Sequence, residues 1–199
     1  MNIFADMLDK KDFKEIRDEF NSFDDNRELV IKKSRDILKL SKQIIYSVHR
    51  DDLKEAAELV KGIENEKKKI EKIISKNSKL ESIGAYRVAI GEYAEAMLYY
   101  HFIKSKKIPT HKSLKVTPEH YLLGLIDLTG ELGRKAVQLA GKGNFKEVVL
   151  IRDIVSEIYG ELLKFDFRES EMRKKFDSVK YDLKKLEDLV LDLKLKGKL

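Results

Sequence analysis

Four acidic residues lie inside two segments that are otherwise largely apolar, and their types and spacing could support chemistry. Glu92 and Glu95 are three positions apart in the first segment, and Asp127 and Glu131 are four positions apart in the second. In an α-helix, either spacing places both side chains on one face. Because an ionised carboxylate is very costly to bury alone, each should meet a cation, a hydrogen-bond network or a metal ion.

Two kinds of site fit this pattern. Oxygen ligands from two adjacent helices suit a hard divalent ion such as Mg²⁺ or Mn²⁺, which can activate water and stabilise charge on a phosphate under attack. Alternatively, nearby cations neutralise the acids in a structural network, and Glu131 and Lys135 have the spacing of an ion pair within one helix. Arg87, Arg134 and His101 could take the same structural role. Spacing alone leaves both interpretations open.

The segments that carry these acids are predicted to be buried helices. From 82 to 103 the sequence is apolar almost all round, which is typical of a helix in the middle of a fold. The segment 117–140 is similar, and it contains Gly124, Gly130 and Gly133. Each glycine inside a helix costs about 1 kcal/mol relative to alanine. Their presence therefore indicates that a neighbouring helix or a ligand approaches closely.

Helical periodicity dominates the rest of the chain, and strand alternation is nearly absent. The predicted fold class is all-α, with a single-domain seven-helix bundle over residues 1–199. The predicted helices span residues 8–21, 25–49, 51–76, 79–105, 117–140, 144–164 and 167–196.

Capping signals set several of these boundaries. Thr117 before Pro118 is typical of an N-cap followed by proline at the first helical position. Ser78 with Glu81, and Asn144 with Glu147, have the spacing of capping boxes. A loop is predicted from 108 to 116.

The composition excludes several classes of site and partner. The 199 residues include no cysteine, which excludes disulfides, thiolate metal sites and cysteine nucleophiles. No apolar run approaches the ~20 residues that a membrane span requires. Residues 1–6 lack a basic region followed by an apolar run, so we expect no membrane association and a cytoplasmic protein.

The net charge of +6 permits a polyanionic partner. Arg35 and Lys39 belong to a basic stretch in the predicted helix 25–49, and they could follow a phosphate backbone. Arg87 and His101 share a predicted helix with Glu92 and are further candidates for phosphate contact. The alternative for each is an ordinary solvated position.

The acidic segments also resemble a known family. Residues 91–96 followed by 100–104, and residues 127–134, resemble the two signature motifs of the translin-associated factor X branch of the translin family. Similarity continues in residues 34–50 and 191–197, so it runs in order from about Asn26 to Gly197.

This resemblance implies an all-α seven-helix bundle that assembles into a closed, often octameric shell with a nucleic-acid-binding interior. In that branch the activity is magnesium-dependent endoribonuclease cleavage of single-stranded RNA. The resemblance makes Glu92, Glu95 and Asp127 metal-holding catalytic carboxylates, with Glu131 as a fourth. Gly133 stands where the family has a bulkier residue, as does the glycine before Glu92. The family nuclease also works beside a translin subunit, so the partner of this chain stays open.

Three functions therefore remain. The first is a metal-dependent endoribonuclease acting on single-stranded RNA inside a homo-oligomer. The second is a non-catalytic protein that binds single-stranded RNA or DNA through its basic stretches. The third is an interaction protein that only oligomerises.

Overall fold

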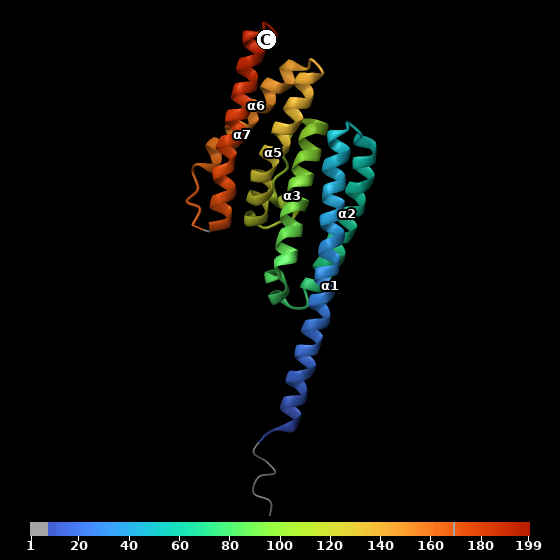
Figure 1. Cartoon of the computed structure of the whole chain (residues 1–199). Helices are drawn as coiled ribbons and strands as arrows, with labels where there is room; N and C mark the ends of the chain where they lie inside the picture. Colours follow the sequence, from blue (N-terminus) through green and yellow to red (C-terminus); the bar gives the residue numbers. More distant parts are fainter. Residues whose placement is uncertain (1–7, 169) are drawn as a thin grey trace, which may run out of the picture.

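Helices α1 and α2 form one side of the molecule. The computed structural model describes residues 8–168 and 170–199. Helix α1 spans Lys10–His49 and α2 spans Leu53–Ile74, and the two pack against each other as an antiparallel pair (Figure 1). Asp51 turns the chain between them with a left-handed φ of 62°. The Asp52 side chain then accepts a hydrogen bond from the Glu55 backbone N–H and caps α2.

Helices α3 and α5 occupy the middle of the bundle. A short 3₁₀ turn, η1 (Ser78–Ser82), leads into α3 (Gly84–Ser105), and the single-turn helix α4 (His111–Leu114) precedes α5 (Pro118–Gly141). Helix α3 packs against α1 on one side and α5 on the other (Figure 1). This central position agrees with the largely apolar character of α3.

Helices α6 (Phe145–Leu162) and α7 (Ser170–Leu195) complete the fold. Both pack against α5 and against each other. The buried apolar side chains from all these long helices form one continuous core. In residues 8–168 and 170–199, no helix combines the length and the apolar character needed to cross a membrane. Residues 1–7, on which the expectation of a cytoplasmic protein partly depends, lie outside the described part.

The all-α prediction is confirmed, with seven α-helices and no strand in the described residues. The seven are not those predicted, because the segments 8–21 and 25–49 form one continuous helix, α1. No glycine or proline lies between Lys10 and His49 to end the helix. The Asn26 side chain donates a hydrogen bond to the Ser22 carbonyl, 2.6 Å away, and thus does not compete with the helix.

The predicted start of the helix 79–105 is wrong. Asn77, not Ser78, accepts a hydrogen bond from the Lys79 backbone N–H, and the turn that follows is 3₁₀. Ile83 is extended, with ψ of 121°, so α3 begins only at Gly84. Helix α4 lies inside the predicted loop 108–116 and restores the number of α-helices to seven.

The other two capping predictions hold to different degrees. Thr117 is confirmed as the N-cap of α5, where its hydroxyl accepts a hydrogen bond from the His120 backbone N–H. Asn144 is the N-cap of α6, but its side chain makes no capping hydrogen bond.

Candidate carboxylate site

A close approach between α3 and α5 brings the four acidic residues to one region. At Gly124 of α5, an added Cβ atom would lie 2.6 Å from the Glu95 backbone nitrogen and 2.7 Å from the Ala94 Cβ. Real Cβ atoms essentially never come so close, so only glycine fits at this contact. The expected close approach is therefore confirmed at Gly124. It is not found at Gly133, where a Cβ would meet no atom within 4 Å.

Glu95 is the most deeply buried of the four acids, with 8% of its surface exposed. Burial, together with the negative charges of Asp127, Glu92 and Glu131, raises the pKa of its carboxyl group to about 8. Asp127 and Glu131 therefore act on Glu95 across the α3–α5 contact, and Glu92 acts on it from within α3. A site with this much negative charge and little solvent stabilises a bound cation.

Glu92 is half-buried and connects two cavities. One, of about 140 Å³, is lined by Arg87, Glu92, Asp127 and Lys175 among others. The second is lined by Lys42, Glu92, Glu95, Glu131 and Arg134 together with Ile45 and Tyr46. Burial raises the pKa of Glu92, whereas the nearby charge of Lys42 lowers it. The acids thus line openings on the molecular surface, where a ligand can reach them.

Asp127 and Glu131 already have cationic or hydrogen-bonding partners. Asp127 Oδ2 lies 2.5 Å from Lys175 Nζ of α7. Glu131 Oε2 is held by His49 Nε2, and Arg134 lies 3.9 Å away. These contacts hold the two α5 acids in place at the edge of the site.

His49 connects Glu131 to a second buried group. Its Nδ1 lies 3.0 Å from the Tyr99 hydroxyl, which is fully buried in α3. Because an ionised carboxylate only accepts hydrogen bonds, Nε2–H donates to Glu131, and Nδ1 accepts from Tyr99. Burial raises the pKa of Tyr99 and so keeps this hydroxyl protonated as a donor. The chain Tyr99–His49–Glu131 fixes the side chain of Glu131.

A divalent ion fits the donor chemistry, though the side chains do not already enclose one. Across residues 8–168 and 170–199, no group of three or more His, Asp or Glu side chains is arranged to hold a metal ion. Asp127 instead pairs with Lys175, so a bound metal ion would have to replace that ammonium as the counter-charge. The buried Glu95 carboxyl, with its pKa raised to about 8, is the observation that fits a cation at this position.

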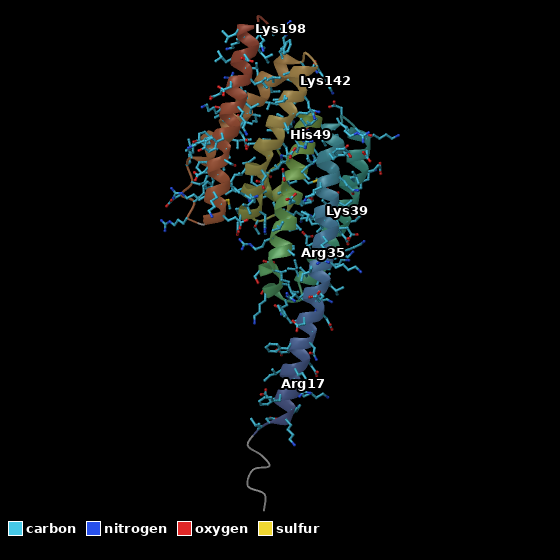
Figure 2. All side chains as sticks on the ribbon, in the orientation of Figure 1. Arg17, Arg35, Lys39, His49, Lys142 and Lys198 are labelled. Carbon is cyan, nitrogen blue, oxygen red and sulfur yellow. The ribbon has the colours of Figure 1, made fainter. Side chains whose placement is uncertain are left out.

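The four predicted nucleic-acid contacts divide into three groups. Arg87 lines the smaller cavity beside Glu92 and Asp127, and it also pairs with Glu119 of α5. Arg35 and Lys39 are exposed on α1, four positions apart and on one face (Figure 2). His101 lies away from the acids, because nine residues after Glu92 is the opposite side of α3.

His101 faces different charges from those expected. Its pKa is lowered by burial and by Lys104, and the carboxylate that acts on it is Glu64 of α2. The expectation that His101 flanks the acidic site is therefore corrected. The basic face of α1 does reach the site, since Lys42, three positions after Lys39, lines the cavity with Glu92 and Glu95.

One expected ion pair is also corrected. Lys135 does not pair with Glu131, because its buried ammonium contacts Asp51 at 2.6 Å and the Val48 carbonyl at 3.3 Å. It therefore caps the C-terminal end of α1. No local signal in the sequence predicts the role of Lys175, which is 48 positions from Asp127 in the chain. The contact of His49 with Glu131 is not predicted either, although a histidine at the buried end of a helix is a recognisable candidate for such a contact.

The comparisons with known proteins agree on one family. The model of the Translin family matches residues 25–197. Translin-associated protein X of Pongo abelii is 27% identical over 229 residues, which cover 93% of this chain and 78% of that protein. An uncharacterised protein of Methanocaldococcus jannaschii is 30% identical over 152 residues, 72% of this chain and 64% of that protein.

Solved structures share the fold. The crystal structure of apo-NeC3PO superposes with a TM-score of 0.84 at 28% identity, covering 93% of this chain and 97% of that one. The structure of an AfC3PO–duplex RNA complex has a TM-score of 0.82 at 24% identity, with 92% and 97% coverage.

Proposed function

This chain belongs to the translin family, and on that premise we propose that it is a metal-dependent endoribonuclease that cleaves single-stranded RNA within an oligomeric shell. The observation that carries the proposal is the group of four acids around the α3–α5 contact. Glu95 is buried there, and Asp127, Glu92 and Glu131 all raise its pKa. The ion would be Mg²⁺ or Mn²⁺, since the donors are carboxylate oxygens.

The acids have distinct roles in this proposal. Glu92, Glu95 and Asp127 hold the ion, and Glu131 completes the site in the position that His49 gives it. When bound, the ion supplies the acidity that activates a water molecule and stabilises charge on the phosphate. Lys42 and Arg87 line the cavities beside the acids and are placed to hold phosphate oxygens.

The basic face of α1 provides a path for RNA toward the acids. Arg35, Lys39 and Lys42 follow one another at helical spacing, and only Lys42 lines the acidic cavity. A strand that runs along this face would exchange its counterions for these side chains, so its binding should weaken as salt rises. Single-stranded DNA carries the same phosphates and is proposed as a second ligand.

The names of the relatives support RNA as the ligand and assembly into an oligomer. One solved relative is a complex with duplex RNA, and several relatives carry the name translin-associated protein X. We therefore propose a homo-oligomer, an octamer in its complete form, with RNA inside. Because that complex holds a duplex, cleavage should be compared on a single strand and on a duplex of the same sequence.

Cleavage of a labelled single-stranded RNA oligonucleotide should require Mg²⁺ and stop with EDTA. Glu92→Ala should reduce the rate by at least about tenfold, because even indirect supports of a metal site are worth 10–100-fold. Glu157→Ala, which removes an exposed acid on α6, is the matched control and should cleave like the parent. The proposal fails if Glu92→Ala or Asp127→Asn cleaves as fast as the parent at equal metal concentration.

A second function is favoured by one specific observation. Asp127 is paired with Lys175 and Glu131 with His49, so part of the acidic site is neutralised without an ion. If these pairs replace the metal ion, the chain binds single-stranded RNA or DNA without cutting it. Binding would then be salt-sensitive and unchanged by EDTA, and no cleavage would appear in Mg²⁺ or Mn²⁺.

A further inference from the structure

The N-terminal part of α1 runs beyond the rest of the bundle. We call residues 10–27 the projecting segment; it lies clear of the other helices except near its inner end, and Arg17 marks its middle (Figures 1 and 2). The first buried residue of α1 is Val30. The family model matches from residue 25, so most of the projecting segment precedes that match.

The projecting segment carries an exposed apolar stripe. Phe13, Ile16 and Phe20 are 50%, 44% and 69% exposed, and Phe23, half-buried, follows at the inner end. Their spacing alternates between three and four positions, which is the pattern of a helix that packs along another helix. After one interruption, where Arg27 is exposed, the same spacing resumes in the buried face of α1 at Val30, Ser34, Ile37, Ser41, Ile44 and Val48.

The apolar stripe favours a packing partner, because most helical stability in proteins comes from packing of an apolar face and aromatic side chains gain most from burial. The stripe is therefore a surface that another helix should cover. Burying the exposed parts of these side chains in two copies would remove roughly 700 Å² from water, to which flanking residues add, so the pairing is a small interface.

The charges of the projecting segment indicate which partner covers the stripe and in which direction that partner runs. The segment begins with Lys10 and Lys11 and approaches its end with Asp24 and Asp25. Two copies in antiparallel orientation place the basic end of one against the acidic end of the other. Parallel copies would instead set like charges side by side, which is unfavourable.

We propose that the projecting segments of two copies of this chain pair as an antiparallel two-helix coiled coil. In this register Phe13 faces the partner's Phe23, and Ile16 faces the partner's Phe20. Arg17 lies near the two-fold axis, whereas Lys10 lies near the partner's Asp24. The pairing concerns residues outside the carboxylate site and holds whether or not the protein cleaves RNA.

Single cysteines in the full-length protein test this pairing, since the sequence has no cysteine of its own. Under mild oxidation, Arg17→Cys should form a disulfide-linked pair of chains on a non-reducing gel. Lys10→Cys should not cross-link with itself, but it should cross-link when mixed with Asp24→Cys. Self-linking by Lys10→Cys, or failure of Arg17→Cys to link, would overturn the proposal and assign the stripe to another surface.

A second substitution shows whether the stripe causes the cross-link. Adding Phe20→Glu to Arg17→Cys should reduce the linked fraction by more than about tenfold, because it places a carboxylate in an apolar seam. Adding Ser22→Glu is the matched control, as it adds the same charge on the exposed side of the same segment. Ser22→Glu should leave linking unchanged, and equal effects of the two substitutions would contradict a role for the stripe.

Discussion

Replacing Gly124 with alanine is expected to lower the free energy of unfolding by about 1–3 kcal/mol, as overpacking of a tight contact does. The new Cβ would lie 2.6 Å from the Glu95 backbone nitrogen and 3.0 Å from the Ala94 carbonyl carbon. Backbone atoms cannot move aside as a flexible side chain can, so α5 must shift away from α3. Chemical denaturation with a helical signal measures the loss.

The same substitution should impair the proposed activity more than the stability. Asp127 follows Gly124 by three residues and Glu95 is at the contact itself, so a shift of α5 changes the distances between the acids. Displacements of about 1 Å in a catalytic site can cost about 10²-fold in rate. We therefore expect Gly124→Ala to cleave RNA about 10²-fold more slowly at a temperature where it remains folded.

Gly133→Ala is the matched control in the same helix. A Cβ there meets no atom within 4 Å, so the helix gains about 0.5–1 kcal/mol from losing a glycine, without a clash. Opposite signs at Gly124 and Gly133 would establish that close packing, and not helix propensity, decides the effect. If Gly124→Ala were as stable and as active as the parent, the close contact would have no functional importance.

The sequence predicts the helices well where local chemistry decides them. Thr117 with Pro118 predicts the start of α5 because capping and the fixed φ of proline act within one turn. The division of α1 into two helices is wrong because nothing local marks whether a polar stretch such as Asp24–Asp25 turns or continues. The missing turn before Gly84 has the same cause, since Ser78 and Glu81 satisfy the capping pattern in a 3₁₀ turn as well.

The site is predicted in part. Acids spaced by three and four in apolar helices are visible in the sequence, and the structure brings them together. Their partners are not visible, because Lys175 and His49 reach the acids through the packing of α7 and α1 on α5. The expected position of His101 is wrong because residues close in sequence can lie on opposite faces of a helix, and nine residues lead to the opposite face.

Stability of the metal-free protein should fall as the pH rises through the titration of Glu95. Its pKa in the folded protein is about 8, against an ordinary value of 4.5, because burial and three nearby carboxylates oppose its ionisation. A raised pKa contributes stability that is complete below the ordinary value and is lost as the pH rises through the folded value. The loss should therefore occur between about pH 4.5 and pH 8 and amount to about 2–4 kcal/mol.

Glu95→Gln isolates this effect, because glutamine has the shape of the protonated acid and does not ionise. The variant should match the parent near pH 4 and exceed its free energy of unfolding by about 2–4 kcal/mol at about pH 9 in EDTA. Glu157→Gln, at an exposed position, should follow the parent at every pH. Other groups titrate in both proteins, so the difference between parent and variant, measured by urea unfolding at each pH, is the relevant quantity.

Mg²⁺ should stabilise the parent more than it stabilises Glu95→Gln. A divalent ion favours the ionised carboxylate, so it should stabilise the parent at about pH 9 by compensating the charge that burial disfavours. Glu95→Gln has lost that charge and should gain less from Mg²⁺ while cleaving RNA more slowly, although it is the more stable protein without metal. An inactive but stabilised variant would mean that the buried charge of Glu95 is retained for ion binding. Equal pH dependence in parent and variant would show instead that burial does not raise the pKa of Glu95.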